Sequence, residues 1–401
     1  MKQGFERWRK NNLKRPYTAN NSVEWIQSGE RYFRLIEELI DSARFEVHLQ
    51  TFIFEQDLTG KRIVEALIRA ARRQVEVFIL VDAYGSSDIG QSLMQRFVKE
   101  GIQFRKFGKI YSGGNFHIGR RLHHKILVID GTKSLVGGIN ISDHYSGANG
   151  KKAWLDFAVL MQGGISRRLQ YICRKSWNKN TFSFKSARQL LSNKGPQLVV
   201  QSTGAVRIRR NDFTRNKFEI TLSYREAFRS AEQTITLVGG YFLPGGRTRR
   251  LLKNAVKRGV KIDVIVSEKS DVKVLENARR YLYNWLLKNG VNVYEYLPSN
   301  VHGKVIVMDD KWISIGSYDL NNLSSYSNIE LNVDVIDDHV ASKLASHLND
   351  LIKKDYRKVT SELDYKNASL ISRFFMWVSY RIVKTLFVLS FILAGAEETE
   401  K

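Results

Sequence analysis

The most constraining feature of this sequence is a polar pattern that occurs twice with identical spacing. Each copy has the form H-x-K-x4-D-x6-G-x-x-N, with Asp instead of Asn at the end of the second copy. The copies are His123, Lys125, Asp130, Gly137 and Asn140, and then His302, Lys304, Asp309, Gly316 and Asp319. The chain has only 8 His in 401 residues, so two chance matches are very rare. The pattern predicts a duplicated chain whose halves meet at one shared active site.

The sequence around the two motifs repeats as well. Residues 70–77 resemble residues 255–262, and a short apolar run follows each of them. Upstream, residues 45–54 pair with residues 234–242, and both are rich in β-branched and aromatic residues. The order of strands and helices predicts an α/β fold, with a mixed sheet in each half flanked by helices and a pseudo-twofold axis between the halves.

The predicted organisation has five parts. The first helix is expected at residues 30–42, where apolar residues recur at helical spacing. A linker is expected where Gly195 and Pro196 interrupt the periodicity. The predicted parts are a basic segment at 1–19, a first half at 20–185, a linker at 186–201, a second half at 202–357, and a C-terminal helix with an acidic tail at 358–401.

Composition limits the partners and the compartment. The formal charge is +24, from 64 Lys and Arg against 40 Asp and Glu, which favours polyanions: nucleic acid, anionic lipid surfaces or phosphorylated substrates. The single cysteine, Cys173, cannot form an internal disulfide, so we expect a packed thiol in a reducing compartment. Residues 1–12 are basic and contain no apolar h-region, so we expect no secretion signal. The sequence contains no clean run of 18 apolar residues, so we expect no uninterrupted membrane span.

The residue types in the motif suit phosphoryl transfer without a metal. Alternate residues of a strand share a face, so His123 and Lys125 are expected to project together. Lysines can hold non-bridging phosphate oxygens, while one histidine attacks phosphorus and the other exchanges protons with the alcohols. Asp130 and Asp309 are placed where each strand ends, where they could accept backbone N–H bonds. Gly137 is expected to leave its backbone open to an anion, as is its counterpart in the second motif.

At these residues the chain resembles the phospholipase D superfamily, and within it the shorter type of bacterial cardiolipin synthase. The resemblance covers about residues 20 to 355 and includes local strings at 50–54, 82–86, 137–140 and 241–245. It implies transfer of a phosphatidyl group, through a phosphohistidine, to phosphatidylglycerol with release of glycerol. No cofactor is expected. The residues themselves argue against a metal, because no clustered Cys or His–carboxylate ligand set is present and lysine is a poor partner for a bound cation.

The resemblance also implies roles for individual residues. His123 would be the nucleophile and His302 the acid and base. Lys125, Lys304 and Asn140 would contact phosphate. The motif aspartates Asp130 and Asp309 are counted with the catalytic residues. Asp156 and Glu330 occupy places where acidic residues orient a catalytic imidazole, although exposed carboxylates would be a simpler explanation.

Asp319 departs from the family pattern, because a carboxylate would repel a phosphodiester unless it is protonated or turned away. Asn321 or Asn322 could supply the missing amide. The sequence alone leaves that choice open.

Residues 374–394 form the second informative stretch. Arg373, Arg381 and Lys384 fall in one sector of a helical wheel, and apolar residues dominate the rest. Such a helix suits the headgroup boundary of an anionic membrane, here the cytoplasmic face of a bacterial cell membrane. A helix docked on the core, or a membrane span, are the alternatives.

Three functional classes remain open. A phosphatidyl transferase explains the motifs, the charge and the C-terminal helix together, with phosphatidylglycerol as the anionic substrate. A phospholipase D hydrolase differs only in using water as the acceptor. A nuclease of the same superfamily explains the charge but leaves the apolar helix unused, so no nucleic acid partner is expected. A non-enzymatic scaffold conflicts with the retention of His and Lys in both motifs.

Overall fold

The computed structural model describes residues 17–108, 111–112, 115–116, 120–178, 204–321, 328–360 and 368–399. These residues form two compact units. The N-terminal unit comprises Tyr17–Ala153 and Phe157–Ile208, and the C-terminal unit comprises Trp154–Asp156 and the chain from Arg209 onward. The predicted linker at 186–201 lies outside the described residues, as does most of the basic amino-terminal segment.

The N-terminal unit is built on a mixed sheet in the order β4-β3-β2-β8-β9-β10-β1. Its strands β2, β3 and β4 are parallel, and the remaining pairings in this order are antiparallel. The strands are β1 (Thr18–Gln27), β2 (Glu46–Thr51), β3 (Glu76–Asp82), β4 (Gln103–Phe107), β7 (Arg121–Leu122), β8 (Ile126–Ile129), β9 (Lys133–Gly137) and β10 (Phe157–Gln162), with a small hairpin of β5 (Tyr111–Ser112) and β6 (Asn115–Phe116).

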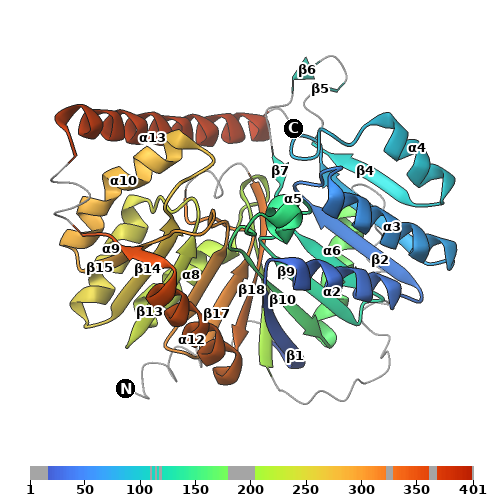
Figure 1. Ribbon diagram of the computed structural model, residues 1–401, viewed down its shortest axis with the longest axis horizontal. Coiled ribbons are helices and arrows are strands. Elements are labelled where there is room, and N and C mark those ends of the chain that lie inside the picture. The colour runs from blue at the N-terminus through green and yellow to red at the C-terminus, as the bar shows by residue number, and fades with distance from the viewer. Residues whose placement is uncertain are drawn as a thin grey trace. The chain divides into compact units, whose positions relative to one another are not determined.

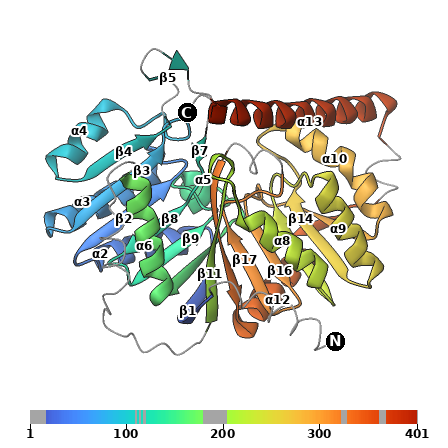
Figure 2. The same cartoon turned by 180° about the vertical axis from the view of Figure 1, so that it is seen from behind.

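Helices cover both faces of this sheet. Figure 1 shows α2 and α3 in front of the strands, and Figure 2 shows α6 on the opposite face. The predicted first helix is confirmed, because α2 buries Phe33, Ile36, Leu39 and Ile40. The helices are α2 (Glu30–Asp41), α3 (Leu58–Arg72), α4 (Gln91–Lys99), α5 (Asp143–Ser146) and α6 (Gly164–Trp177), with a 3-10 turn η1 (Ala148–Gly150).

The C-terminal unit contains a second mixed sheet, in the order β19-β15-β14-β13-β16-β17-β18. Here β13, β14 and β15 are the parallel strands. The strands are β13 (Thr234–Gly239), β14 (Lys261–Ser267), β15 (Val291–Tyr296), β16 (Lys304–Met308), β17 (Trp312–Gly316), β18 (Asn328–Ile336) and β19 (Tyr356–Lys358). Strand β11 (Gly204–Asp212) pairs with β1 near its start and with β12 (Lys217–Phe218) at its end.

The second sheet is also covered on both faces. Figure 1 shows α12 on the near face, and Figure 2 shows α8 and α9 on the other. The helices are α8 (Glu219–Ser230), α9 (Gly246–Lys257), α10 (Lys273–Lys288), α12 (Asp338–Lys354) and α13 (Leu370–Thr399), with a 3-10 turn η2 (Phe213–Arg215).

The two sheets repeat one topology, which confirms the predicted α/β duplication. The order β4-β3-β2-β8-β9-β10 of the N-terminal unit corresponds strand by strand to β15-β14-β13-β16-β17-β18. Strands β8 and β16 follow the two motif histidines and hold central places, and every residue in both strands is buried. Continuous apolar strands are expected where helices cover both faces of a sheet.

The C-terminal helix docks on α10, as Figure 1 shows. Val383 joins a buried cluster with Leu243, Ala278 and Leu282, and Tyr380 stacks on Tyr281 with 4.9 Å between ring centroids. The opposite side of α13 leaves large apolar residues exposed to solvent, namely Leu370, Ile371, Phe374, Phe375, Trp377, Ile382 and Leu386. Among the described helices, none combines the length and hydropathy that crossing a bilayer requires.

Candidate active site

Each motif begins immediately before a central strand. The expectation that His123 and Lys125 lie within a strand is wrong, since β8 begins at Ile126. The Lys125 Nζ folds back and donates to the His123 carbonyl oxygen at 2.9 Å. In the second motif, Lys304 is the first residue of β16, and its Nζ likewise donates to the carbonyl oxygen of His302.

An aromatic ring supports each histidine and lysine pair. The Phe52 ring meets the His123 imidazole edge to face, with 4.9 Å between centroids, and the Lys125 Nζ lies 5.3 Å from the same ring. In the second unit, Tyr241 lies 6.2 Å from His302 in the same perpendicular manner. The strings containing Phe52 and Tyr241 stood out in the sequence, but nothing in them indicated this contact.

A side chain at the end of a parallel strand, two places from the motif strand in the sheet, anchors the residue before each histidine. Asp82, the last residue of β3, accepts the Leu122 N–H at 2.8 Å. Burial raises the pKa of Asp82, although backbone N–H groups donate to its carboxylate. Ser267, the last residue of β14, accepts the Val301 N–H at 2.7 Å. Neither anchor could be assigned a role from the sequence, because partners so distant along the chain leave no local signal.

A buried carboxylate orients the second imidazole. Asp156 is fully buried, and its Oδ2 lies 2.6 Å from the His302 Nδ1. The short segment that carries Asp156 also binds the backbone around the histidine, because the Leu155 carbonyl accepts from the His302 and Gly303 N–H groups. The predicted orienting carboxylate therefore serves the second motif, although it follows the first motif in sequence. A contact of this kind at Nδ1 fixes the orientation of the imidazole ring.

Glu330 occupies the matching place in the repeat. Asp156 stands two residues before Ala158, which pairs with Gly137, and Glu330 stands two residues before Asn332, which pairs with Gly316. Glu330 is fully buried, so it is not the exposed carboxylate of the simpler explanation. Its carboxylate accepts from the Ser317 hydroxyl at 2.5 Å and from the Asn328 amide at 3.0 Å.

The motif aspartates bind backbone at the far end of each strand. Asp130 accepts from the backbone N–H groups of Arg44, Phe45 and Glu46 at 2.8–2.9 Å. Asp130 stands seven positions after His123, a span of about 20 Å for an extended chain. Asp309 accepts from Glu232, Gln233 and Thr234 at 2.8–3.0 Å. We therefore assign both carboxylates to anchoring the strand, and not to the chemistry with which the sequence grouped them.

The motif glycines serve strand packing, contrary to the expected approach of an anion. A Cβ on Gly137 would lie 2.4 Å from the Phe157 carbonyl oxygen, and one on Gly316 would lie 2.4 Å from that of Leu331. Both contacts involve the neighbouring strand, so any side chain at either position would push the sheet apart.

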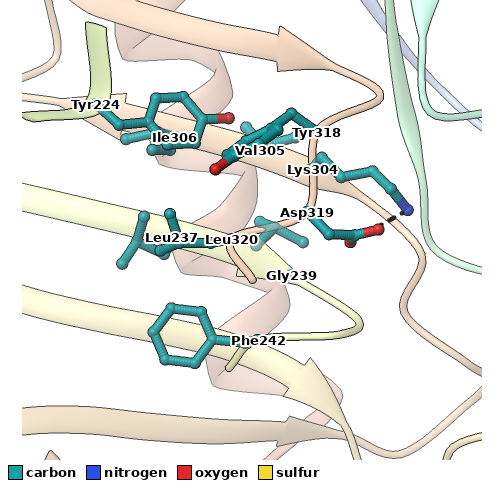
Figure 3. A pocket seen from close by; sticks show the side chains of 11 residues that line it. Tyr224, Leu237, Gly239, Phe242, Lys304, Val305, Ile306, Tyr318, Asp319 and Leu320 are labelled. Carbon is teal, nitrogen blue, oxygen red and sulfur yellow. Dashed lines mark ion pairs between the residues drawn. The ribbon is translucent and has the colours of Figure 1, made fainter. Parts of the chain in front are cut away.

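The last motif position differs between the copies. The Asn140 amide is used within the N-terminal unit, since it accepts from the Ile53 N–H at 3.1 Å and donates to the Tyr145 hydroxyl at 2.9 Å. At the equivalent position of the second motif, Asp319 forms a buried ion pair with Lys304, with 3.5 Å between Oδ1 and Nζ (Figure 3).

Asp319 and Lys304 also line a pocket with Tyr224, Phe242 and Tyr318, shown in Figure 3. Its free volume is about 10 Å³, which holds about one water molecule and no lipid headgroup. Asn321 donates its amide to the Tyr241 carbonyl oxygen, and Asn322 lies outside the described residues. Within the described ranges, no three His, Cys, Asp or Glu side chains gather as ligands for a metal ion.

The fold and the repeated motif define the class of protein. It is a duplicated α/β protein of the phospholipase D type, with one His–Lys pair in each unit. A family model described as cardiolipin synthase, PLD-like domain, matches residues 36–152 and 224–352. The chain therefore belongs to this family, which confirms the resemblance seen in the sequence.

Individual relatives agree with the family. Cardiolipin synthase B of Shigella flexneri and that of Escherichia coli (strain K12) are each 30% identical over 360 residues, covering 86% of this chain and 84% of theirs. Cardiolipin synthase A of Pseudomonas entomophila is 29% identical, covering 86% of this chain and 71% of its own. A solved phosphatidylserine synthase of Haemophilus influenzae Rd KW20 shares the fold, with a TM-score of 0.74 at 14% identity, covering 96% of this chain and 99% of that one.

Proposed function

We propose that this chain is a phosphatidyl transferase that makes cardiolipin from two molecules of phosphatidylglycerol. The proposal rests chiefly on the duplicated His–Lys motif, in which one imidazole is held by a buried carboxylate. A family of enzymes named cardiolipin synthases supports the choice of substrate. Each histidine has its own task in the two steps of the reaction.

In the first step His123 is the nucleophile. Its imidazole nitrogen attacks phosphorus and forms a P–N bond, while the bond from phosphorus to the glycerol oxygen breaks. His302, protonated and held by Asp156, gives its proton to that oxygen, and glycerol leaves. Lys125 and Lys304 bind the non-bridging oxygens, where negative charge accumulates.

In the second step His302 acts as the base. It removes the proton from a hydroxyl of a second phosphatidylglycerol, the oxygen attacks phosphorus, and the P–N bond breaks. Cardiolipin forms, and His302 ends with the proton that it needs for the next cycle. The equal register positions of Asp156 and Glu330 support an orienting role for Glu330 as well.

The substrates are lipids, so the enzyme works at a membrane surface. We assign the contact to the exposed side of α13, where Phe374, Phe375 and Trp377 are accompanied by Arg381 and Lys384. Apolar side chains beside cations suit an interface of anionic lipids. Peripheral attachment at the cytoplasmic face follows from the same reasoning, since basic surfaces favour the anionic lipids there.

Product analysis tests the proposal. Purified protein is incubated with phosphatidylglycerol vesicles, and the products are resolved by mass. We expect cardiolipin and glycerol in equal amounts. Phosphatidic acid without cardiolipin would instead identify a phospholipase D hydrolase, in which water replaces the acceptor lipid.

A further inference from the structure

Arg279 of α10 is a fully buried cation, and among the described residues its hydrogen bonds go to backbone carbonyl groups alone. Its Nη2 donates to the Ser267 carbonyl oxygen at 2.6 Å, and its Nη1 donates to the Gly240 carbonyl oxygen at 3.3 Å. No carboxylate forms an ion pair with this guanidinium within the part of the chain that the structure describes. Burying a charge without a counter-ion is costly, so an arginine with this environment calls for a specific role.

Both carbonyl groups belong to residues that support His302. Ser267 holds the residue before the histidine, because its hydroxyl oxygen accepts the Val301 N–H at 2.7 Å and lies 3.2 Å from the Val301 carbonyl oxygen. The Arg279 guanidinium therefore holds the Ser267 carbonyl group, and the Ser267 side chain holds Val301 at the start of the motif.

Gly240 connects Arg279 to the histidine by a second route. A Cβ on Gly240 would lie 2.1 Å from the Val301 carbonyl oxygen and 3.4 Å from the His302 Cα, so the two backbones touch. The next residue is Tyr241, whose ring stands perpendicular to the His302 imidazole. Arg279 thus ties together the ends of β13 and β14, which carry the two supports of the imidazole.

We propose that Arg279 is a positioning residue for His302 in the phosphatidyl transfer reaction. The planar guanidinium spans two carbonyl groups on adjacent strand ends, a geometry that a single ammonium group reproduces only in part. Arg279 touches neither imidazole nor substrate in this account. In the N-terminal unit the residue before the histidine is anchored by a charged side chain, because the Asp82 carboxylate accepts the Leu122 N–H.

This inference rests on the proposed function, in which His302 is the proton donor of the first step and the base of the second. A substrate whose headgroup is p-nitrophenol separates those steps. Nitrophenolate leaves as an anion and needs no proton, so formation of the P–N bond does not depend on His302. Attack by the acceptor alcohol still requires His302 to remove a proton.

The test compares Arg279→Met with the wild type on phosphatidyl-p-nitrophenol in phosphatidylglycerol vesicles. We expect the variant to keep the initial burst of nitrophenolate, while the following steady rate falls about 10- to 100-fold, the size of effect that follows a small misplacement of a reacting group. Arg279→Lys keeps the charge and one donor group, and its steady rate is expected to lie between the two.

The matched control is Arg280→Met, one residue along the same helix. Arg280 is partly exposed, forms an ion pair with Glu276 at 3.4 Å and donates to the Glu268 carbonyl oxygen at 3.3 Å, away from both supports of His302. Its burst and steady rate are expected to stay within about twofold of the wild type.

Two results would overturn the assignment of Arg279. Burst and steady rate could fall by the same factor as the folded fraction, which would show a purely structural role, or both could remain unchanged. Failure of the proposed function looks different. Wild-type protein would then make no cardiolipin, whether or not it releases nitrophenolate.

Discussion

At the scale of single residues, the two motifs differ most in the charge beside each lysine. Lys304 is paired with the buried carboxylate of Asp319, whereas the equivalent position in the first motif is the amide of Asn140. The pair lowers the positive charge that Lys304 presents to a phosphodiester. In this account Lys125 therefore carries the larger share of phosphate binding.

Asp319→Asn is expected to preserve or raise turnover. Asparagine has nearly the same shape and can still accept from Lys304, but it removes the charge that opposes the substrate. Steady-state rates on phosphatidylglycerol vesicles, compared at equal folded concentrations, measure the effect. A large loss of activity in this variant would show that the carboxylate has its own role in the reaction.

The motif aspartates are predicted to act on stability and not on chemistry. Asp130→Asn and Asp309→Asn each disturb three backbone donors and should lower the free energy of unfolding by about 1–3 kcal/mol. Urea unfolding measures this change. Asp350→Asn removes an exposed carboxylate 3.7 Å from Lys353, and this control should shift stability by less than about 0.5 kcal/mol. Lost turnover in fully folded Asp130→Asn protein would contradict the assignment.

At the scale of elements, strands and helices followed from sequence because their signals are local. The apolar runs after each motif predicted β8 and β16, and helical spacing predicted α2. Cys173 proved to be fully buried, and burial raises the pKa of its thiol, in agreement with a packed residue. The partner of Asp156 could not be predicted, because 146 positions of sequence separate it from His302 and only the folded chain joins them.

A buried carboxylate that the sequence did not single out ties β2 to α6. Burial would raise the pKa of Glu46, but hydrogen bonds from His48 and Arg174 outweigh it and lower the pKa to about 2. A depressed pKa stabilises the folded state above the ordinary value of 4.5, and this contribution is lost as pH falls from about 4.5 to about 2. The shift corresponds to about 3 kcal/mol.

Glu46→Gln should therefore reduce the dependence of the free energy of unfolding on pH in the acid range. We expect the variant to be less stable than the wild type at neutral pH and to approach it near pH 2, since protonation removes the same charge. Thermal unfolding across that range measures the difference. A difference that stays constant from neutral pH to pH 2 would show that the Glu46 charge contributes nothing.

The C-terminal helix has two apolar sides with different predicted roles. Val383→Asp places a charge in the cluster with Leu243 and Leu282, so it should lower stability by about 2–4 kcal/mol or release α13. Leu386 is 54% exposed, so Leu386→Asp should leave stability within about 0.5 kcal/mol but weaken binding to anionic vesicles. Unfolding and vesicle co-sedimentation separate the two effects. Full vesicle binding by Leu386→Asp together with Phe375→Ser would contradict the membrane role.

At the scale of the whole molecule, the duplication matters because its copies are not equivalent. The supports of the two histidines differ, with Asp82 in the N-terminal unit and Ser267 with Arg279 in the C-terminal unit. Sequence repetition predicted the shared topology but could not reveal these differences, which arise from contacts between distant strands. These differences between the two copies agree with the proposal that their histidines have different roles, one as nucleophile and the other as acid and base.

The most direct measurement is the site at which the intermediate forms. Protein mixed with phosphatidylglycerol vesicles is quenched rapidly, digested, and searched by mass for a phosphatidyl group on histidine. We predict that the group lies on His123 and that it accumulates in His302→Asn protein, where its removal lacks a base. A phosphatidyl group on His302, or turnover that persists in His123→Asn protein, would contradict the account.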